Sequence, residues 1–169
     1  PGEDGKITKK LENLGISHST CSSSMAELTF NKKKCLEMVE KIGIKTAKSR
    51  LIKKGQNVNE KEIKDEIGFP CFVKPNQSGS SFGISKVYSP KELKPALNKA
   101  LKEDNEILIE SYLSGREVTV GVYKINGKIE VLPITEIISE NDFFDYKAKY
   151  EGESDEIIPA KLPIDLEIK

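Results

Sequence analysis

Residues 69–87 read FPCFVKPNQSGSSFGISKV, a segment in which an apolar run meets a lysine, a proline and then a loop of small residues. The apolar run from Phe69 to Val73 predicts a strand, and Lys74 stands at its end. The loop that follows Pro75 offers bare backbone N–H groups and hydroxyls. Because a buried cation needs an anionic partner, the segment predicts a site for a negatively charged ligand such as a phosphate.

The composition is that of a globular chain with balanced charge. Its 169 residues are enough for one domain or two small ones. The 27 lysines and arginines equal the 27 aspartates and glutamates, which argues against a nucleic-acid partner held by bulk charge. Three cysteines without metal-binding spacing predict reduced thiols in a cytoplasmic protein. No apolar run is long enough to predict a membrane span.

Around the opening segment, periodic helices alternate with strands and hairpins. This order predicts an α+β fold with largely antiparallel sheets and flanking helices. Two stretches lack a period: the serine-rich residues 16–28, interpreted as a connector, and the polar loop 139–155. We expect helices at 31–42, 59–67 and 90–101 and a short one capped by Asp4, strands at 48–53, 69–74, 84–88 and 106–113, and a hairpin over 117–131 turning at Asn126-Gly127.

The Gly/Ser loop is a weak signal taken alone. It matches neither of the common glycine-rich phosphate-binding motifs, and a flexible hairpin loop is the alternative. Lys32, near the start of the first long helix, supports the phosphate interpretation, because two lysines on separate elements can contact different phosphate oxygens. Its neighbours Lys33 and Lys34 leave open a solvated charge run.

Two carboxylates mark the segment EILIESYLSGREVTV. Glu110 arrives where a buried strand would continue, so it needs a donor such as the amine of adenine. Glu117 follows seven residues later and is suited to hydrogen bonds with ribose hydroxyls. The alternative for both is a surface charge or a salt bridge.

A third candidate is the aperiodic segment FFDYKAKYEGESDEI, which begins at Phe143. Aromatic side chains in a long polar loop indicate a lid that packs over a ligand. Lys149 lies between Tyr146 and Tyr150, where it could neutralise a phosphoryl group during transfer.

Together these segments resemble the D-alanine–D-alanine ligase family of the ATP-grasp superfamily. The resemblance rests on FVKPNQSGSSFGISKV, ILIESYLSGREVTVGV, LPITEI and FFDYKAKY, and the opening PGEDGKITKKLENLGI is similar to the end of that family's N-terminal domain. It implies an incomplete ATP-grasp fold. Residues 1–28 would end the preceding domain, residues 29–116 would form the small ATP-grasp subdomain, and residues 117–169 would begin the large one with its ω-loop.

The resemblance also implies roles for individual residues. Lys32 and Lys74 would contact ATP phosphates, and Ser80 and Ser81 lie in the loop that would close over them. Glu110 would bind the adenine amine, Leu113 would be the backbone hinge beside the ring, and Glu117 would bind the ribose. Catalytic roles fall to Ser80, which would orient Tyr150 of the ω-loop near the substrate, and to Lys149, which would contact the γ-phosphate.

The implied reaction is ATP-dependent ligation of two D-alanines through an acyl phosphate, a step of peptidoglycan synthesis and hence of cell-wall biogenesis and cell shape. Magnesium would assist, with its ligands outside this chain, so the chain alone is expected to be inactive. The resemblance further implies a homodimer in the full-length enzyme. A ligase that joins D-alanine to D-lactate or D-serine, and a non-catalytic nucleotide-binding module, remain alternatives.

Overall fold

The computed structural model describes residues 2–139, 142–143 and 154–163, and its contacts divide the chain into two units, Pro1–Leu113 and Ser114–Lys169. The division falls close to the boundary expected at residues 116 and 117, although the subdomain assignment itself stays a prediction. Within the described ranges, no helix combines the length and the apolar character needed to cross a bilayer.

The first unit is built on a four-stranded antiparallel sheet. Its strands are β1 (Ser49–Lys53), β2 (Cys71–Pro75), β3 (Ser85–Val87) and β4 (Glu106–Ser111), in the order β1-β4-β2-β3. β1, β3 and β4 lie within the segments for which strands are predicted, and β2 begins two residues later and ends one residue later than the predicted strand at 69–74. The opening segment therefore forms a hairpin, in which β2 and β3 flank the Gly/Ser loop.

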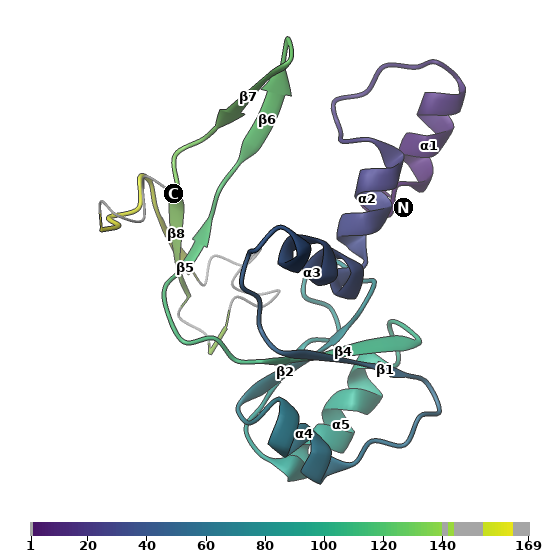
Figure 1. Ribbon diagram of the computed structural model, residues 1–169, viewed down its shortest axis with the longest axis vertical. Coiled ribbons are helices and arrows are strands. Elements are labelled where there is room, and N and C mark those ends of the chain that lie inside the picture. Colours follow the sequence, from purple (N-terminus) through teal and green to yellow (C-terminus); the bar gives the residue numbers. More distant parts are fainter. Residues whose placement is uncertain (1, 140–141, 144–153, 164–169) are drawn as a thin grey trace. The chain divides into compact units, whose positions relative to one another are not determined.

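Strand alternation divides the sheet into an apolar face and a polar face. Cys71, Val73 and Pro75 of β2 are buried, whereas Phe72 and Lys74 point to the opposite face. Helices α4 (Glu60–Glu66) and α5 (Pro90–Ala100) cover the apolar face, as Figure 1 shows. The core contains Ile52, Ile63, Ile67, Cys71, Val73, Val87, Leu93, Ala96, Ala100, Ile107 and Ile109.

Three N-terminal helices pack in series, α1 (Lys6–Asn13) on α2 (Ser23–Phe30) and α2 on α3 (Lys32–Lys41), and the start of α3 is hydrogen-bonded to Asn76 at the end of β2. The prediction of a connector over residues 16–28 is wrong, because α2 begins there with Ser22 as its N-cap. The N-cap of α1 is Gly5 rather than Asp4, whose carboxylate instead accepts a hydrogen bond from the Lys6 N–H. Asn31 caps α3 as predicted, accepting from the Lys34 N–H.

The apolar patterns around Cys35 and Cys71 predict that both pack in a core. Cys71 is fully buried, but Cys35 is only half-buried and α3 has no buried residue. The sequence Ser89-Pro90-Lys91-Glu92 predicts a capping box at the start of α5, and the observed contacts differ from it. Glu92 accepts from the Tyr88 N–H and the Ser89 hydroxyl, while Ser89 caps no N–H group.

The second unit contains a three-stranded sheet and a two-stranded hairpin. The sheet has the order β5-β8-β9, and the hairpin pairs β6 with β7. The predicted turn is confirmed, since Asn126 and Gly127 have φ angles of 49° and 80°. Strand β9 was not predicted and begins inside the segment expected to be a loop. The bounds are β5 (Glu117–Thr119), β6 (Val122–Ile125), β7 (Lys128–Val131), β8 (Thr135–Ser139) and β9 (Ser154–Ile157).

Candidate functional site

Lys74 and Glu110 form an ion pair on the polar face of the first sheet. Glu110 lies directly opposite Phe72 across β4 and β2, so Lys74 is its diagonal neighbour two residues further along β2. Their side chains are 20% and 11% exposed, respectively. Both residues are partly buried, and the ion pair is the salt-bridge alternative that the sequence left open for Glu110. Their roles as ligands of ATP stay predictions.

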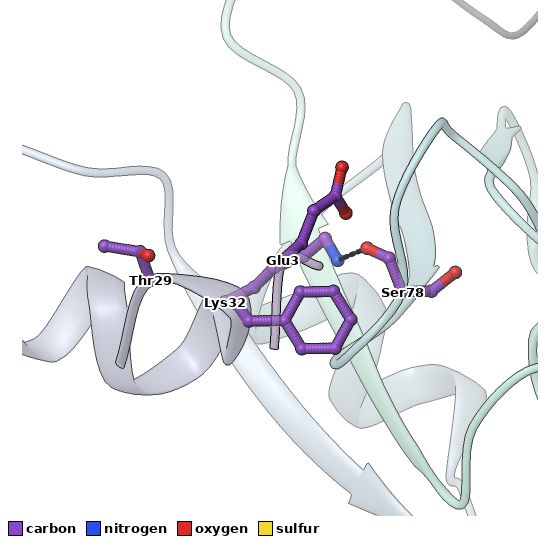
Figure 2. A pocket seen from close by; sticks show the side chains of 5 residues that line it. Glu3, Thr29, Lys32 and Ser78 are labelled. Carbon is purple, nitrogen blue, oxygen red and sulfur yellow. Dashed lines mark hydrogen bonds between the residues drawn. The ribbon is translucent and has the colours of Figure 1, made fainter. Parts of the chain in front are cut away.

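Lys32 reaches the same region from the first residue of α3. Its ammonium group donates to the Ser78 carbonyl at 2.7 Å and lies 3.4 Å from the Asn76 carbonyl. Figure 2 shows this contact beside a cavity of about 280 Å³, which Glu3, Thr29 and Phe30 also line.

The surroundings make Lys32 an unusual cation. Burial and, after it, the positive charge of Lys74 lower the pKa of Lys32 to about 8, although Glu110, Asp104 and Glu3 act in the opposite sense. Two ammonium groups close enough to repel each other form a site in which an added anion is favoured.

The loop between β2 and β3 is a defined series of turns. Ser80 and Ser81 have φ angles of 51° and 59°, in the left-handed region that side chains disfavour by roughly 1–2 kcal/mol per residue. Gly83 also has a positive φ, and a Cβ there would lie 2.8 Å from the Pro75 ring. Strained backbone of this kind clusters at ligand-binding loops, so the loop's shape agrees with the phosphate interpretation.

The other predicted site residues are not gathered by the first unit. Leu113 is 66% exposed at the end of that unit. Glu117 begins β5 and is exposed within the second unit. Lys149 and Tyr150 lie outside the described residues. The residues that the structure brings together are thus Lys32, Lys74 and Glu110, with the loop that carries Ser80 and Ser81.

Sequence reasoning missed the residue that ties this site together. Asn76 was assigned to the loop, yet its side chain is fully buried and hydrogen-bonded to Asn31 and Glu106. The next peptide is also held, because the Gln77 N–H donates to Asp104 at 2.7 Å. The only sequence signal was an amide directly after a buried strand, which is equally typical of an exposed turn.

Arg116 and Glu136 form an ion pair in the second unit that the sequence did not predict. The guanidinium donates through Nε and one terminal nitrogen to the two carboxylate oxygens, both at 2.5 Å, and through the other to the Lys161 carbonyl at 2.7 Å. The pair raises the pKa of Arg116 and lowers that of Glu136. Because Arg116 precedes Glu117, this fork fixes the start of β5.

The described residues do not supply a magnesium site. Across residues 2–139, 142–143 and 154–163, no three His, Cys, Asp or Glu side chains are grouped so that they could hold a metal ion. Asp104 and Glu106 lie near the site, but their carboxylates accept from Gln77 and Asn76. Among the described residues, this site therefore offers no set of oxygen ligands for a hard cation.

Comparison with known proteins decides the family. Residues 38–169 match the model described as D-ala D-ala ligase C-terminus. The chain belongs to the D-alanine–D-alanine ligase family. A D-alanine–D-alanine ligase of Flavobacterium johnsoniae is 55% identical over 166 residues, covering 98% of this chain and 51% of the relative. One from Phocaeicola vulgatus is 46% identical over 165 residues, with coverage of 98% and 51%.

Solved structures agree with this family assignment. The D-Ala:D-Ser ligase VanG of Enterococcus faecalis is 34% identical with a TM-score of 0.83, over 99% of this chain and 49% of its own. A D-alanine–D-alanine ligase of Bacillus anthracis is 34% identical with a TM-score of 0.81, over 99% and 53%. The predicted ATP-grasp fold is thereby confirmed, and the chain spans about half the length of the curated relatives it matches.

Proposed function

We propose that this chain forms part of an ATP-dependent ligase that joins two D-alanines into D-alanyl-D-alanine for peptidoglycan synthesis. We use the term full-length protein for a protein that contains this chain together with the other half that its relatives have. The proposal is supported most by two partly buried lysines, Lys32 and Lys74, which lie near each other and near a Gly/Ser loop in a chain of this family.

The reaction has two chemical steps. A carboxylate oxygen of the first D-alanine attacks the γ-phosphorus of ATP, and the bond to ADP breaks, giving an acyl phosphate. The amine of the second D-alanine then attacks the acyl carbon and loses a proton, and phosphate leaves as the amide forms. In both steps negative charge builds up on a leaving phosphate oxygen, of ADP in the first and of inorganic phosphate in the second, so positioning and charge stabilisation supply most of the catalysis.

We assign the site residues of the first unit to ATP binding. Lys32 and Lys74 hold phosphate oxygens, and the strained backbone at Ser80 and Ser81 shapes the loop that closes over them. Glu110 holds the adenine amine. In this assignment Lys74 exchanges its present partner Glu110 for a phosphate when ATP binds, so the ion pair pre-orients both side chains. One solved relative from Bacillus anthracis, 30% identical with a TM-score of 0.79, is described as complexed with ATP.

The remaining assignments follow the family resemblance. Leu113 serves as the hinge beside the adenine ring, Glu117 binds the ribose, Lys149 contacts the γ-phosphate, and Tyr150, oriented by Ser80, lies at the substrate. Magnesium ligands come from the rest of the full-length protein, so this chain alone does not catalyse ligation. Its three free cysteines support a cytoplasmic location. We retain the homodimer as a prediction that light scattering of the full-length protein tests.

Incubation of the full-length protein with ATP and with D-alanine alone, D-alanine plus D-serine, or D-alanine plus D-lactate tests the function. We expect D-alanyl-D-alanine as the main product, together with one ADP and one phosphate per dipeptide. The 34% identity to VanG makes a D-Ala-D-Ser product the second candidate. A dominant mixed product would replace the substrate assignment, and ATP binding without any ligation would leave a nucleotide-binding module.

A further inference from the structure

Asn76 is a buried amide at the junction of three elements. It follows the last residue of β2, and its side chain has no exposed surface. Its Oδ1 accepts from the Lys33 N–H at 2.9 Å, and its Nδ2 donates to Asn31 Oδ1 at 3.1 Å and to Glu106 Oε2 at 3.0 Å. The side chain thus joins the end of β2 to the start of both α3 and β4.

The main chain of Asn76 completes the junction. Its carbonyl accepts from the Lys32 N–H at 3.1 Å, and the ammonium group of Lys32 lies 3.4 Å from the same oxygen. Its own N–H donates to the Glu106 carbonyl at 2.8 Å. The first two N–H groups of α3, which have no acceptor within the helix, therefore both donate hydrogen bonds to Asn76.

The chemistry of the junction requires an amide. One atom must accept from a backbone N–H while the other donates to two oxygens, and of the short side chains only asparagine presents both. The three partners also fix which atom is oxygen and which is nitrogen. A carboxylate would place its second oxygen against Asn31 Oδ1 and Glu106 Oε2. Alanine would remove the acceptor of the Lys33 N–H and one donor from each of Asn31 and Glu106, although Asn31 would keep its bond from the Lys34 N–H.

We propose that Asn76 is a positioning residue that holds Lys32 at a fixed distance from Lys74. Lys74 lies on β2, two residues before Asn76. Lys32 begins α3, and Asn76 accepts hydrogen bonds from the first two N–H groups of that helix. One buried residue thereby fixes the start of α3 beside the end of β2, although Lys32 and Lys74 lie 42 residues apart in the sequence. The inference rests on the proposed function, because it gives these lysines their task as phosphate ligands.

Fixing Lys32 in advance lowers the conformational entropy that is lost when ATP binds. A lysine side chain has many rotamers, and ordering it on binding weakens affinity. The Asn76 side chain holds the Lys33 N–H at the start of α3, and the Ser78 carbonyl holds the ammonium group of Lys32 at 2.7 Å, so the Lys32 side chain is already fixed at both ends. Figure 2 shows the ammonium group of Lys32 at the Ser78 carbonyl. Loss of the Asn76 side chain would loosen the first turn of α3, which carries Lys32, while the Asn76 carbonyl and the ammonium group stay chemically unchanged.

The test compares Asn76→Ala with two matched controls in the full-length protein. Asn98→Ala removes the same side chain from an exposed position of α5, and Val87→Ala destabilises the core from β3 without touching the junction. ATP affinity is measured by direct titration where all proteins are folded. We expect Asn76→Ala to weaken ATP binding by roughly tenfold to a hundredfold, and both controls to stay near wild type.

Two further measurements separate positioning from general loss of stability. Hydrogen exchange at the Lys33 amide, which donates to the Asn76 side chain, should accelerate in Asn76→Ala and not in Val87→Ala. Asn76→Asp should also weaken ATP binding, and the double variant Asn76→Asp/Glu106→Gln should recover part of it, because the glutamine amide can donate to the new carboxylate.

Each outcome is informative. Equal ATP affinity in Asn76→Ala and Asn98→Ala would overturn the inference, as would an equal loss in Val87→Ala. If the wild-type protein binds ATP but makes no dipeptide, the ligase function fails while the role of Asn76 is still decided by the titration. If it binds no ATP, both fail.

Discussion

In the first unit Lys74 pairs with Glu110 on a sheet whose other face is a closed apolar core, whereas in the second unit Arg116 pairs with Glu136 on a sheet with little burial. The first pair is mostly shielded from water and adjoins another cation, Lys32. The second pair is a complete bidentate fork with the Lys161 carbonyl as a third partner. We therefore expect similar side chains to serve ligand binding in the first unit and local order in the second.

The apolar residues of the two units differ in the same way. Ile109 has no exposed surface, whereas Ile129 in the β6–β7 hairpin is 68% exposed. We expect Ile109→Ala to lower the free energy of unfolding by about 2–5 kcal/mol, and Ile129→Ala to change it by less than about 0.5 kcal/mol. Denaturant unfolding of both variants in the full-length protein measures this. A large loss at Ile129 would show that the hairpin has a partner outside the described residues.

Removal of the partly buried cation tests the binding side of the comparison. Lys74→Ala should weaken ATP binding by roughly 1.5–3 kcal/mol, through loss of a charge-assisted contact. Lys124→Ala, on the exposed strand β6, is the matched control and should leave ATP binding unchanged. An unaltered kcat and KM for ATP in Lys74→Ala would remove this residue from the site.

The pKa of Lys32 predicts a pH dependence. Since burial and Lys74 lower this pKa from 10.5 to about 8, ATP affinity should fall as pH rises through about 8, where the ammonium group loses its proton. Stability has the opposite sign: between pH 8 and 10.5 the unfolded state binds more protons, so the contribution of Lys32 to stability rises with pH. ATP titrations from pH 7 to 10 check the first statement. Lys32→Met should abolish the step, and its persistence there would assign it to another group.

The smallest effect is expected at the fork of the second unit. Arg116→Lys keeps the charge but loses the planar geometry that binds both oxygens of Glu136. We expect a small loss of stability that shrinks further in high salt, because Arg116 is exposed. Denaturant unfolding at low and high salt measures it. A salt-independent or large loss would show that the pair is part of a more buried network.

Local signals made most of the fold predictable. Asn31 and Asn59 cap the helices that follow them, and Asn126-Gly127 forms the expected turn, because capping and turn geometry depend on neighbouring residues. Helix α2 was missed because its eight residues, SSMAELTF, carry no clear apolar stripe. Strand β9 was missed because it begins with polar residues and owes its existence to pairing with β8.

In the candidate site, too, the residues marked by a local sequence signal were predicted and those placed by long-range contacts were not. Lys74 and Glu110 could be singled out because each ends or interrupts an apolar run in its own strand. Asn76 could not, because its partners Asn31 and Glu106 lie 45 and 30 residues away, and a buried amide looks in sequence like an exposed one. Long-range hydrogen bonding, rather than propensity, decides the position of such a residue.

The central claim is that the lysines of the first unit bind the phosphates of ATP. The most direct test is to measure the affinity of the full-length protein for ATP and for adenosine, by competition, in the wild type and in Lys32→Met, which retains the aliphatic stem. The account predicts that Lys32→Met binds ATP more weakly than the wild type and binds adenosine equally well, because the loss requires phosphates. Unchanged ATP affinity, or an equal loss for adenosine, would contradict it.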